Sequence, residues 1–377
     1  MQNVDTISNI RRSETRWRLD ALLVTSSTNF HATDQRDKVY GLLGLAAESQ
    51  DVARTPDALR PDYDLDVVQV YEKVASFIFW EYKSLSTLTL TSGVAGDVSR
   101  TQRKQILEKL PSWVPNWCDF AVRDREIAKG LNWITYSATG GPATLGFPEH
   151  YNASAQFPAS LSESQDQSVL RLSGLRADSV ARVILFDSKT WPAEEHVRET
   201  PILQFWEAAI SFLSETNGMD LVSSFIYATT AKQHILSGKT AEQIQKDGSA
   251  YLRDILLRDE HQELLPASHR DGQDIISLLR SMSIGGSVES YASLAGNFCF
   301  NRSFIITANA RMGIGPTGTR IGDVVTVLFG GSVPYVLRKQ RDGYLFIGES
   351  YIHGLMDGEA IQRWQQGALK DEIFQLR

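Results

Sequence analysis

The densest group of chemically versatile side chains lies near the C-terminus, between residues 347 and 359. Glu349, Tyr351 and His353 alternate along this segment, so an extended backbone would place them on one face. A histidine beside carboxylates and a tyrosine can act as a general acid–base set, because neighbouring groups pull their pKa values toward neutrality. These three residues are candidate catalytic groups. The candidate substrate-binding residues around them are Arg302, Arg338, Asp357 and Glu359.

An alternative explains the same residues without catalysis. Arginine–carboxylate pairs are strong and directional, so these side chains can form an internal ion network. Such a network would hold the end of the β-rich region against the last helix. The residue types alone leave both interpretations open.

A second charged group occupies one turn near the N-terminus, from Asp34 to Lys38. Arg36 is a candidate for binding an anionic ligand, and Asp37 is a candidate catalytic acid or base. In the alternative interpretation, both side chains tie a short helix to its neighbours by hydrogen-bonded ion pairs. Tyr40 and the leucines after it would then lie in the core.

Trp113 and Trp117 lie four residues apart, with Pro115 between them. Because proline stiffens the backbone, the two indoles can form one wall of an apolar, substrate-binding pocket. The alternative is a loop that two large side chains pin to the core.

Other motifs carry little chemistry. The segment 313–318 matches G-x-G-x-x-G, but a strand pattern follows it and Pro316 interrupts it, so it predicts a glycine-rich β-turn. The histidines are scattered without metal-ligand spacing. Cys299 is expected to be a small buried thiol in a strand, with a nucleophilic role as the alternative. We therefore expect no cofactor and no metal.

These candidates need elements to position them. Apolar residues at helical spacing predict a helix over 66–82, capped by Asp66. Further helices are predicted at 14–25, 36–43, 103–110 and within 200–284. Short β-prone runs separated by turns are typical of a small antiparallel sheet. They are expected at 168–173, 179–185, 304–307, 324–329, 335–339 and 344–347.

The pattern predicts an α+β protein, in which N-terminal helices pack on an antiparallel β-sheet or small barrel with an all-helical insertion. The predicted parts are a helical region (1–110), a β-rich region (111–187 and 285–377) and the insertion (200–284). Because the two β-rich stretches are expected to share one sheet, the chain can form a single intertwined unit.

Composition excludes several classes of protein. The 377 residues carry a net charge of −7, which argues against a nucleic-acid partner. No apolar stretch is long enough for a transmembrane helix, and the N-terminus has no apolar signal segment. We expect an intracellular, cytoplasmic chain, and the sequence leaves its oligomeric state unknown.

Three segments together resemble the fungal heterokaryon-incompatibility (HET) proteins. Ala32–Leu45 (ATDQRDKVYGLLGL), followed by Pro61-Asp-Tyr63, is similar to the family's TDPRDKVYALLGL…PDY segment, with Gln35 where proline is usual. Leu110–Trp117 (LPSWVPNW) is similar to LPSWVPDW. The third segment is a C-terminal series from Arg302 to Glu359 that ends in IGESYIHGLMDGE.

The resemblance covers the region that follows the family's N-terminal effector domain. The LWIDAICINQ-type motif of that domain is not found in this sequence. We therefore expect a chain that corresponds to the C-terminal region alone, and the effector activity is not carried over.

Two functional hypotheses follow. The first is a cofactor-independent enzyme of fungal specialised metabolism, acting on a small, largely apolar molecule as a cyclase, isomerase, dehydratase, condensing enzyme or lyase. The alternative is a non-catalytic recognition or regulatory module in self/non-self discrimination, which binds a protein partner. The enzyme predicts a closed apolar pocket with convergent polar groups, whereas the module predicts an exposed apolar patch.

Overall fold

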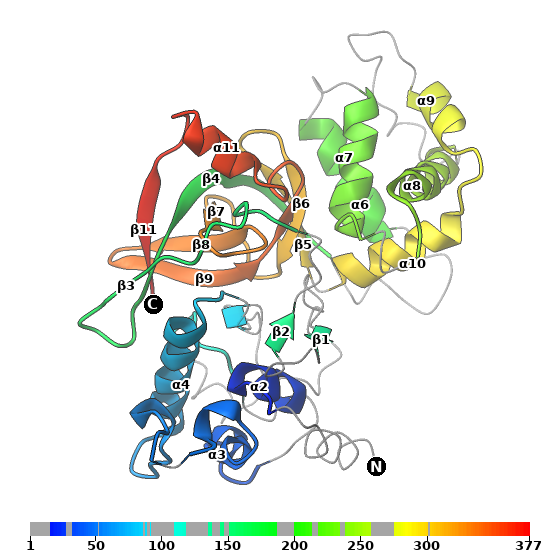
Figure 1. Ribbon diagram of the computed structural model, residues 1–377. Coiled ribbons are helices and arrows are strands. Elements are labelled where there is room, and N and C mark those ends of the chain that lie inside the picture. Colours follow the sequence, from blue (N-terminus) through cyan, green and yellow to red (C-terminus); the bar gives the residue numbers. More distant parts are fainter. Residues whose placement is uncertain are drawn as a thin grey trace, which may run out of the picture. The chain divides into compact units, whose positions relative to one another are not determined.

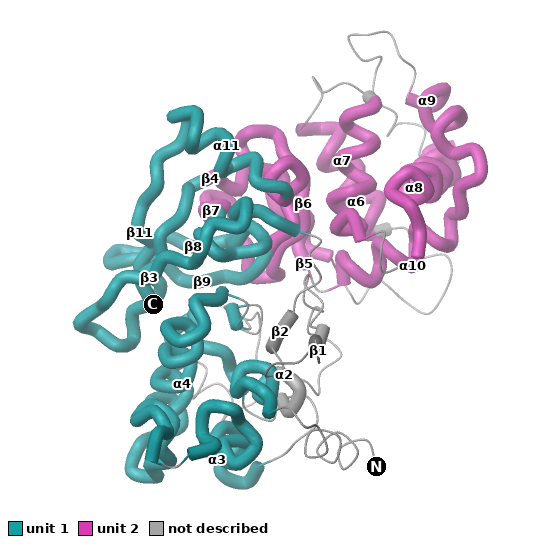
Figure 2. The backbone as a smooth tube through the Cα atoms, viewed as in Figure 1, with its two compact units in different colours: residues 1–176, 326–349, 357–377 teal, residues 177–325, 350–356 magenta. Residues whose placement is uncertain are grey.

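The computed structural model describes residues 16–27, 32–51, 53–85, 87–88, 91, 109–117, 135–137, 144–146, 151–186, 200–212, 218–233, 238–257, 275–300 and 302–377 (Figure 1). The chain divides into two compact units (Figure 2). Unit 1 comprises residues 1–176, 326–349 and 357–377, and unit 2 comprises residues 177–325 and 350–356.

The N-terminal part of unit 1 is helical. It contains α2 (Leu19–Ser27), α3 (Asp37–Leu43), α4 (Val67–Tyr82) and the 3-10 helices η1 (Ala47–Ser49) and η2 (Asp57–Leu59). Helix α4 begins with a capping box, because the Asp66 side chain accepts from the Gln69 backbone and the Gln69 side chain accepts from the Asp66 backbone. Its buried face includes Val70, Val74 and Ile78. The predicted helix over 66–82 is confirmed.

The strands of unit 1 close on themselves. Their order is β4-β11-β9-β8-β7, and β7 pairs again with β4. The bounds are β3 (Leu161–Ser162), β4 (Leu170–Leu185), β7 (Val324–Leu328), β8 (Tyr335–Gln340), β9 (Gly343–Glu349) and β11 (Asp371–Leu376). Strands β11 and β9 run parallel, whereas the other registered pairs are antiparallel. Helix α11 (Glu359–Gln365) precedes β11.

Gly174 allows β4 and β7 to approach each other. A Cβ atom at this position would lie 2.6 Å from the Val327 carbonyl oxygen and 2.8 Å from the Leu328 Cα. Both neighbours are backbone atoms of β7, which no side-chain rotation can move aside. A residue without a side chain is therefore required at this contact. A short hairpin, β1 (Thr135–Ser137) and β2 (Thr144–Gly146), also belongs to this unit.

Unit 2 combines helices with a smaller antiparallel sheet in the order β10-β6-β5-β4. Phe205 stacks on Phe304 at a centroid distance of 4.9 Å, which packs α6 onto β5. The helices are α6 (Thr200–Phe212), α7 (Gly218–Thr230), α8 (Ala241–Leu256), α9 (Ile275–Met282) and α10 (Val288–Cys299). The strands are the second half of β4, β5 (Arg302–Thr307), β6 (Met312–Pro316) and β10 (Tyr351–Ile352).

The predicted α+β class is confirmed, with nine α-helices among the described residues and a large, mostly antiparallel sheet. Several local predictions were wrong. Most of the segment 313–318, expected to form a glycine-rich β-turn, lies in strand β6. The strands expected at 168–173 and 179–185 are one strand, β4, with an irregularity between Val180 and Arg182. Cys299 ends helix α10 rather than lying in a strand, and strand β11 was missed. Most of the helix expected at 103–110 lies outside the described residues.

No helix in the described ranges is long and apolar enough to cross a membrane.

Candidate functional site

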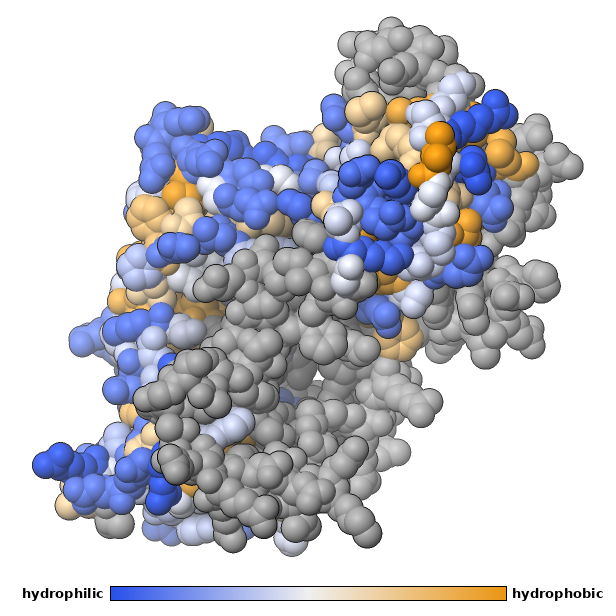
Figure 3. All heavy atoms as spheres, turned by 45° about the vertical axis from the view of Figure 1, so that its right-hand side comes forward, coloured by the Kyte–Doolittle hydropathy of each residue, from blue (hydrophilic) through white to orange (hydrophobic). Residues whose placement is uncertain are grey.

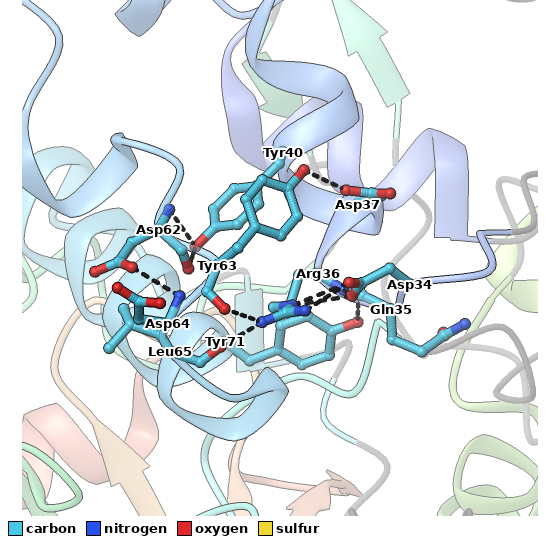
Figure 4. Close-up of polar contacts among 10 residues, drawn as sticks. All are labelled: Asp34, Gln35, Arg36, Asp37, Tyr40, Asp62, Tyr63, Asp64, Leu65 and Tyr71. Atoms are coloured by element: carbon cyan, nitrogen blue, oxygen red, sulfur yellow. Dashed lines mark hydrogen bonds and ion pairs between the residues drawn. The ribbon is translucent and has the colours of Figure 1, made fainter.

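The candidate site is built around Arg36, at the start of α3 in unit 1 (Figure 4). The Asp34 carboxylate accepts from the Arg36 backbone N–H at 3.0 Å and from the guanidinium Nη2 at 2.6 Å. From α4, the Tyr71 hydroxyl donates to the Gln35 carbonyl at 2.9 Å. The turn before α3 is therefore tied both to itself and to the next long helix.

The free edge of the Arg36 guanidinium reaches the turn that precedes α4. Its Nη1 donates to the Tyr63 carbonyl at 2.5 Å and to the Leu65 carbonyl at 2.9 Å. The Tyr40 hydroxyl adds two more bonds, donating to the Asp62 carbonyl at 3.0 Å and accepting from its N–H at 3.1 Å. These bonds join the residue 34–40 segment to the residue 62–65 turn. We call the whole group the Arg36 cluster: Asp34, Arg36, Asp37, Tyr40, Asp62, Tyr63 and Leu65.

Tyr63 is the exposed member of the Arg36 cluster. Its hydroxyl donates to Asp37 Oδ1 at 2.7 Å, and its ring meets that of Tyr40 edge-on at a centroid distance of 5.3 Å. The Arg36 guanidinium carbon lies 5.1 Å from the ring centroid. Tyr63 nevertheless remains 55% exposed. Tyr63 is thus held by the Tyr40 ring, by the hydrogen bond of its hydroxyl and by the hydrogen bond to its backbone carbonyl, while its side chain still faces solvent.

Hydrogen bonds fix the charged side chains of the Arg36 cluster. The hydrogen bond to Asp37 raises the pKa of Tyr63, so its phenol keeps its proton at neutral pH. Hydrogen bonds from Arg36 lower the pKa of Asp34. Asp64 and Asp66 extend the acidic, exposed border of the turn. The arrangement presents a rigid aromatic side chain in acidic surroundings, which suits recognition of a partner surface.

The C-terminal candidates divide between the two units. In unit 2, the Tyr351 hydroxyl lies 3.4 Å from His353 Nδ1, and the His353 ring lies 5.5 Å from that of Tyr227. In unit 1, Glu349 is buried at the end of β9, opposite Tyr335 in β8. Burial raises the pKa of Tyr335, and the nearby Glu349 charge adds to this effect.

The remaining C-terminal candidates lie on several elements. Glu359 Oε2 accepts from the Asp357 backbone N–H at 2.8 Å, beside the first turn of α11. Arg302 is buried in β5 of unit 2, and Arg338 is half-buried in β8 of unit 1. Within the described ranges, Tyr351 thus contacts His353, and the Asp357 backbone contacts Glu359.

The two tryptophans are buried in unit 1 rather than exposed to a solvent-filled space. Trp113 is 0% exposed and Trp117 is 2% exposed. The Trp113 indole N–H donates to the Ser168 carbonyl at 2.8 Å. Its ring meets Phe79 of α4 edge-on, and the Trp117 ring meets Tyr71 in the same way. The loop 111–117 is therefore fastened to α4.

Sequence reasoning missed Tyr40 and Tyr63 as members of a site. The available signal was that both belong to motif segments shared with the resembled family, 32–45 and 61–63. The structure joins these two segments through the hydrogen bonds of Arg36 and Tyr40. Among the described residues, no group of three or more histidine, cysteine, aspartate or glutamate side chains could hold a metal ion. Cys299 is buried and donates to the Thr229 carbonyl, and burial raises its thiol pKa.

Two known sequences or sequence families are similar to this chain. Residues 209–369 match the Het-6 beta-barrel domain. The chain is also 26% identical, over 389 aligned residues, to heterokaryon incompatibility protein 6, OR allele, of Neurospora crassa. The alignment covers 92% of this chain and 52% of that protein. The chain is homologous to a heterokaryon-incompatibility protein. The family resemblance read from the sequence is thus confirmed.

The chain spans about half the length of this relative. No solved structure matches the chain. The prediction of an enzyme of specialised metabolism is wrong, because both comparisons point to heterokaryon incompatibility. The cyclase, isomerase and lyase assignments are wrong for the same reason, and a small-molecule substrate is unsupported.

Proposed function

We propose that the chain is a non-catalytic recognition module related to heterokaryon incompatibility, and that it acts by binding a protein partner. The observation that carries the proposal is the similarity to heterokaryon incompatibility protein 6 along 92% of the chain. Self/non-self discrimination requires one protein to distinguish another, and an exposed, rigid contact surface serves that task.

The Arg36 cluster is the proposed contact surface, with Tyr63 as its anchor. Tyrosine and arginine are enriched among residues that dominate binding energy. Tyrosine in addition offers a large contact area with little conformational entropy to lose. Here that entropy has already been reduced, because the Tyr63 hydroxyl donates to Asp37 and Arg36 donates to the Tyr63 backbone carbonyl. Arg36 and Asp37 act as positioning residues for the exposed ring. The acidic border favours a partner with basic side chains at its rim.

The recognition hypothesis predicted an exposed apolar patch. On the face shown in Figure 3, hydrophobic residues of the described surface form separate small areas among hydrophilic ones. An isolated aromatic anchor in a polar setting fits this surface better than a broad apolar contact does.

We further propose that the closed ring of unit 1 is a small barrel that acts as the scaffold of this surface. A continuous series of contacts supports this. Ser112 accepts from the Phe346 N–H of β9 at 2.8 Å, and Trp113 beside it packs on α4. Tyr71 of α4 then holds the Gln35 carbonyl, next to Arg36. The domain boundaries predicted from the sequence are part of the same proposal.

The test is co-purification from the producing fungus, with the full-length chain as bait. Tyr63→Ala should reduce the recovery of the specific partner at least about tenfold, as expected for the loss of an aromatic anchor. Tyr63→Phe keeps the ring and should retain most of the binding. Ile373→Ala removes another exposed apolar side chain of unit 1, at 45% exposure, and serves as the matched control. Equal recovery with Tyr63→Ala and Ile373→Ala would contradict the assignment of this surface.

A further inference from the structure

A second surface of unit 1 has the chemistry to bind a cation. The described residues that line an open hollow of about 290 Å³ are Trp80, Glu163 and Ser164. Trp80 lies in the last turn of α4, and Glu163 and Ser164 follow strand β3. The volume is at the lower end of the range for ligand pockets, so it suits one side chain rather than a cofactor.

The indole of Trp80 is partly exposed, since 38% of the residue is accessible to solvent. Tryptophan has the strongest cation–π attraction of the aromatic side chains. The Lys83 ammonium lies 4.3 Å from the ring centroid, so the ring already attracts a cation of this chain, and a partner's cation would compete with Lys83 for it. Lys83 adopts a left-handed backbone conformation, with φ at 48°, where α4 ends.

Glu163 supplies the opposite charge. Its side chain is exposed, and its carboxylate forms no ion pair or hydrogen bond with any residue in the described ranges. The backbone of Glu163 is held in place, because Arg171 Nη1 donates to its carbonyl at 3.1 Å. The Ser164 hydroxyl accepts from the Asp166 N–H at 3.3 Å and keeps its own proton for a ligand.

An aromatic face and an exposed carboxylate therefore meet at one hollow.

We propose that this hollow binds an arginine or lysine side chain of a partner protein, held between the Trp80 indole and the Glu163 carboxylate. Arginine fits best, because its planar guanidinium can stack on the indole and still bond to a carboxylate in its plane. The site lies at the opposite end of α4 from Tyr63 and goes beyond the function proposed above.

The test uses two synthetic pentapeptides, acetyl-Gly-Ser-Arg-Ser-Gly-amide and its citrulline counterpart, with the full-length chain. Citrulline keeps the shape of arginine but has no charge. The arginine peptide should shift the Trp80 indole N–H resonance in a saturable way, and the citrulline peptide should bind at least about tenfold more weakly. Equal affinity for the two peptides, or no shift at Trp80, overturns the proposal.

Variants test the two contacts separately, with saturation transfer to the peptide as a readout that does not depend on Trp80. Glu163→Gln should weaken arginine-peptide binding at least about threefold. Glu81→Gln, an exposed site on α4 with the same change of charge, should leave it unchanged. Trp80→Leu should reduce the difference between arginine and citrulline to the part that Glu163 contributes.

Wild-type affinity in either Glu163→Gln or Trp80→Leu overturns the proposal, as does an equal loss in Glu81→Gln. If Trp80→Leu does not fold, the Glu163 and Glu81 pair decides. These titrations do not involve Tyr63, so their failure leaves the Tyr63 surface standing, and the reverse also holds.

Discussion

The two buried tryptophans offer a direct test of the packing that supports the site. Trp113 and Trp117 are both almost fully buried against α4, but their indole nitrogens differ. The Trp113 N–H donates to the Ser168 carbonyl at 2.8 Å, whereas the Trp117 N–H has no hydrogen-bond partner in the described part of the chain. Replacing each with phenylalanine removes a similar volume, so the difference between the two variants isolates the hydrogen bond.

Ser168 is half-buried, so losing the hydrogen bond to its carbonyl costs about 0.5–1.5 kcal/mol. We expect Trp113→Phe to destabilise unit 1 by that amount more than Trp117→Phe does. Trp113→Ala should cost more again, about 3–5 kcal/mol, because it also leaves a cavity.

The assay is urea denaturation followed by circular dichroism, comparing midpoints between variants whose slopes agree. Trp364→Phe is the control for a half-buried indole, since the Trp364 N–H donates to Asp371 Oδ1 at 3.2 Å near the surface. Trp364→Phe should lower the free energy of unfolding by much less than Trp113→Phe does. Equal midpoints for Trp113→Phe and Trp117→Phe would refute the role assigned to the Ser168 bond.

Four further outcomes follow from the structure. Burial raises the folded-state pKa of Glu48 above its ordinary value of 4.5, so the folded chain binds this proton more tightly than the unfolded chain does. The free energy of unfolding therefore falls as the pH rises from 4.5 through the folded pKa. Glu48→Gln should make the urea midpoint less dependent on pH in this range. Asp37→Asn should lower the pKa of Tyr63 toward 10.0, measured from its ring carbon resonance, and an unchanged value would count against the Asp37 bond. Gly313→Ala would place a Cβ atom 2.0 Å from a β10 carbonyl oxygen. This variant should lose about 1–3 kcal/mol or more of unfolding free energy, and its melting temperature should fall. Gly41→Ala, with no atom within 4 Å of the new Cβ, should raise it.

Sequence patterns predicted the helices and strands that residues close together in the chain determine. Helix α4 was found because its apolar spacing and its Asp66 cap lie within one short stretch. Strand β4 was divided in two because Gly174 and the polar residues near 178 are typical of a turn. The structure keeps Gly174 in the strand for a tertiary reason, the close approach of β7. Helix α10 was missed because serine, alanine and glycine give it a weak apolar pattern after the Gly285–Gly286 turn.

The site was predicted only in part for the same reason. Arg36 and Asp37 stood out as an ionic group, and the structure gives both of them hydrogen bonds. Their partners lie 26 to 29 residues away along the chain, in the turn before α4. Pairing across that distance depends on how two helices pack, which spacing does not encode. The functional class was a separate error, because residues suited to acid–base chemistry are also those that build ion pairs and hydrogen bonds.

The strand order of unit 1 has a consequence for synthesis on the ribosome. Strand β11 (371–376) lies between β4 and β9, and all six of its residues are in register with Leu170–Leu175 of β4. About 200 residues must be translated after that part of β4 before β11 emerges, which takes roughly 10–40 s at 5–20 residues per second. During this interval the β11-facing edge of β4 has no permanent neighbour, and an unpaired edge is a template for wrong pairing. Newly made chains should therefore depend on chaperones until the last six-residue strand is in place.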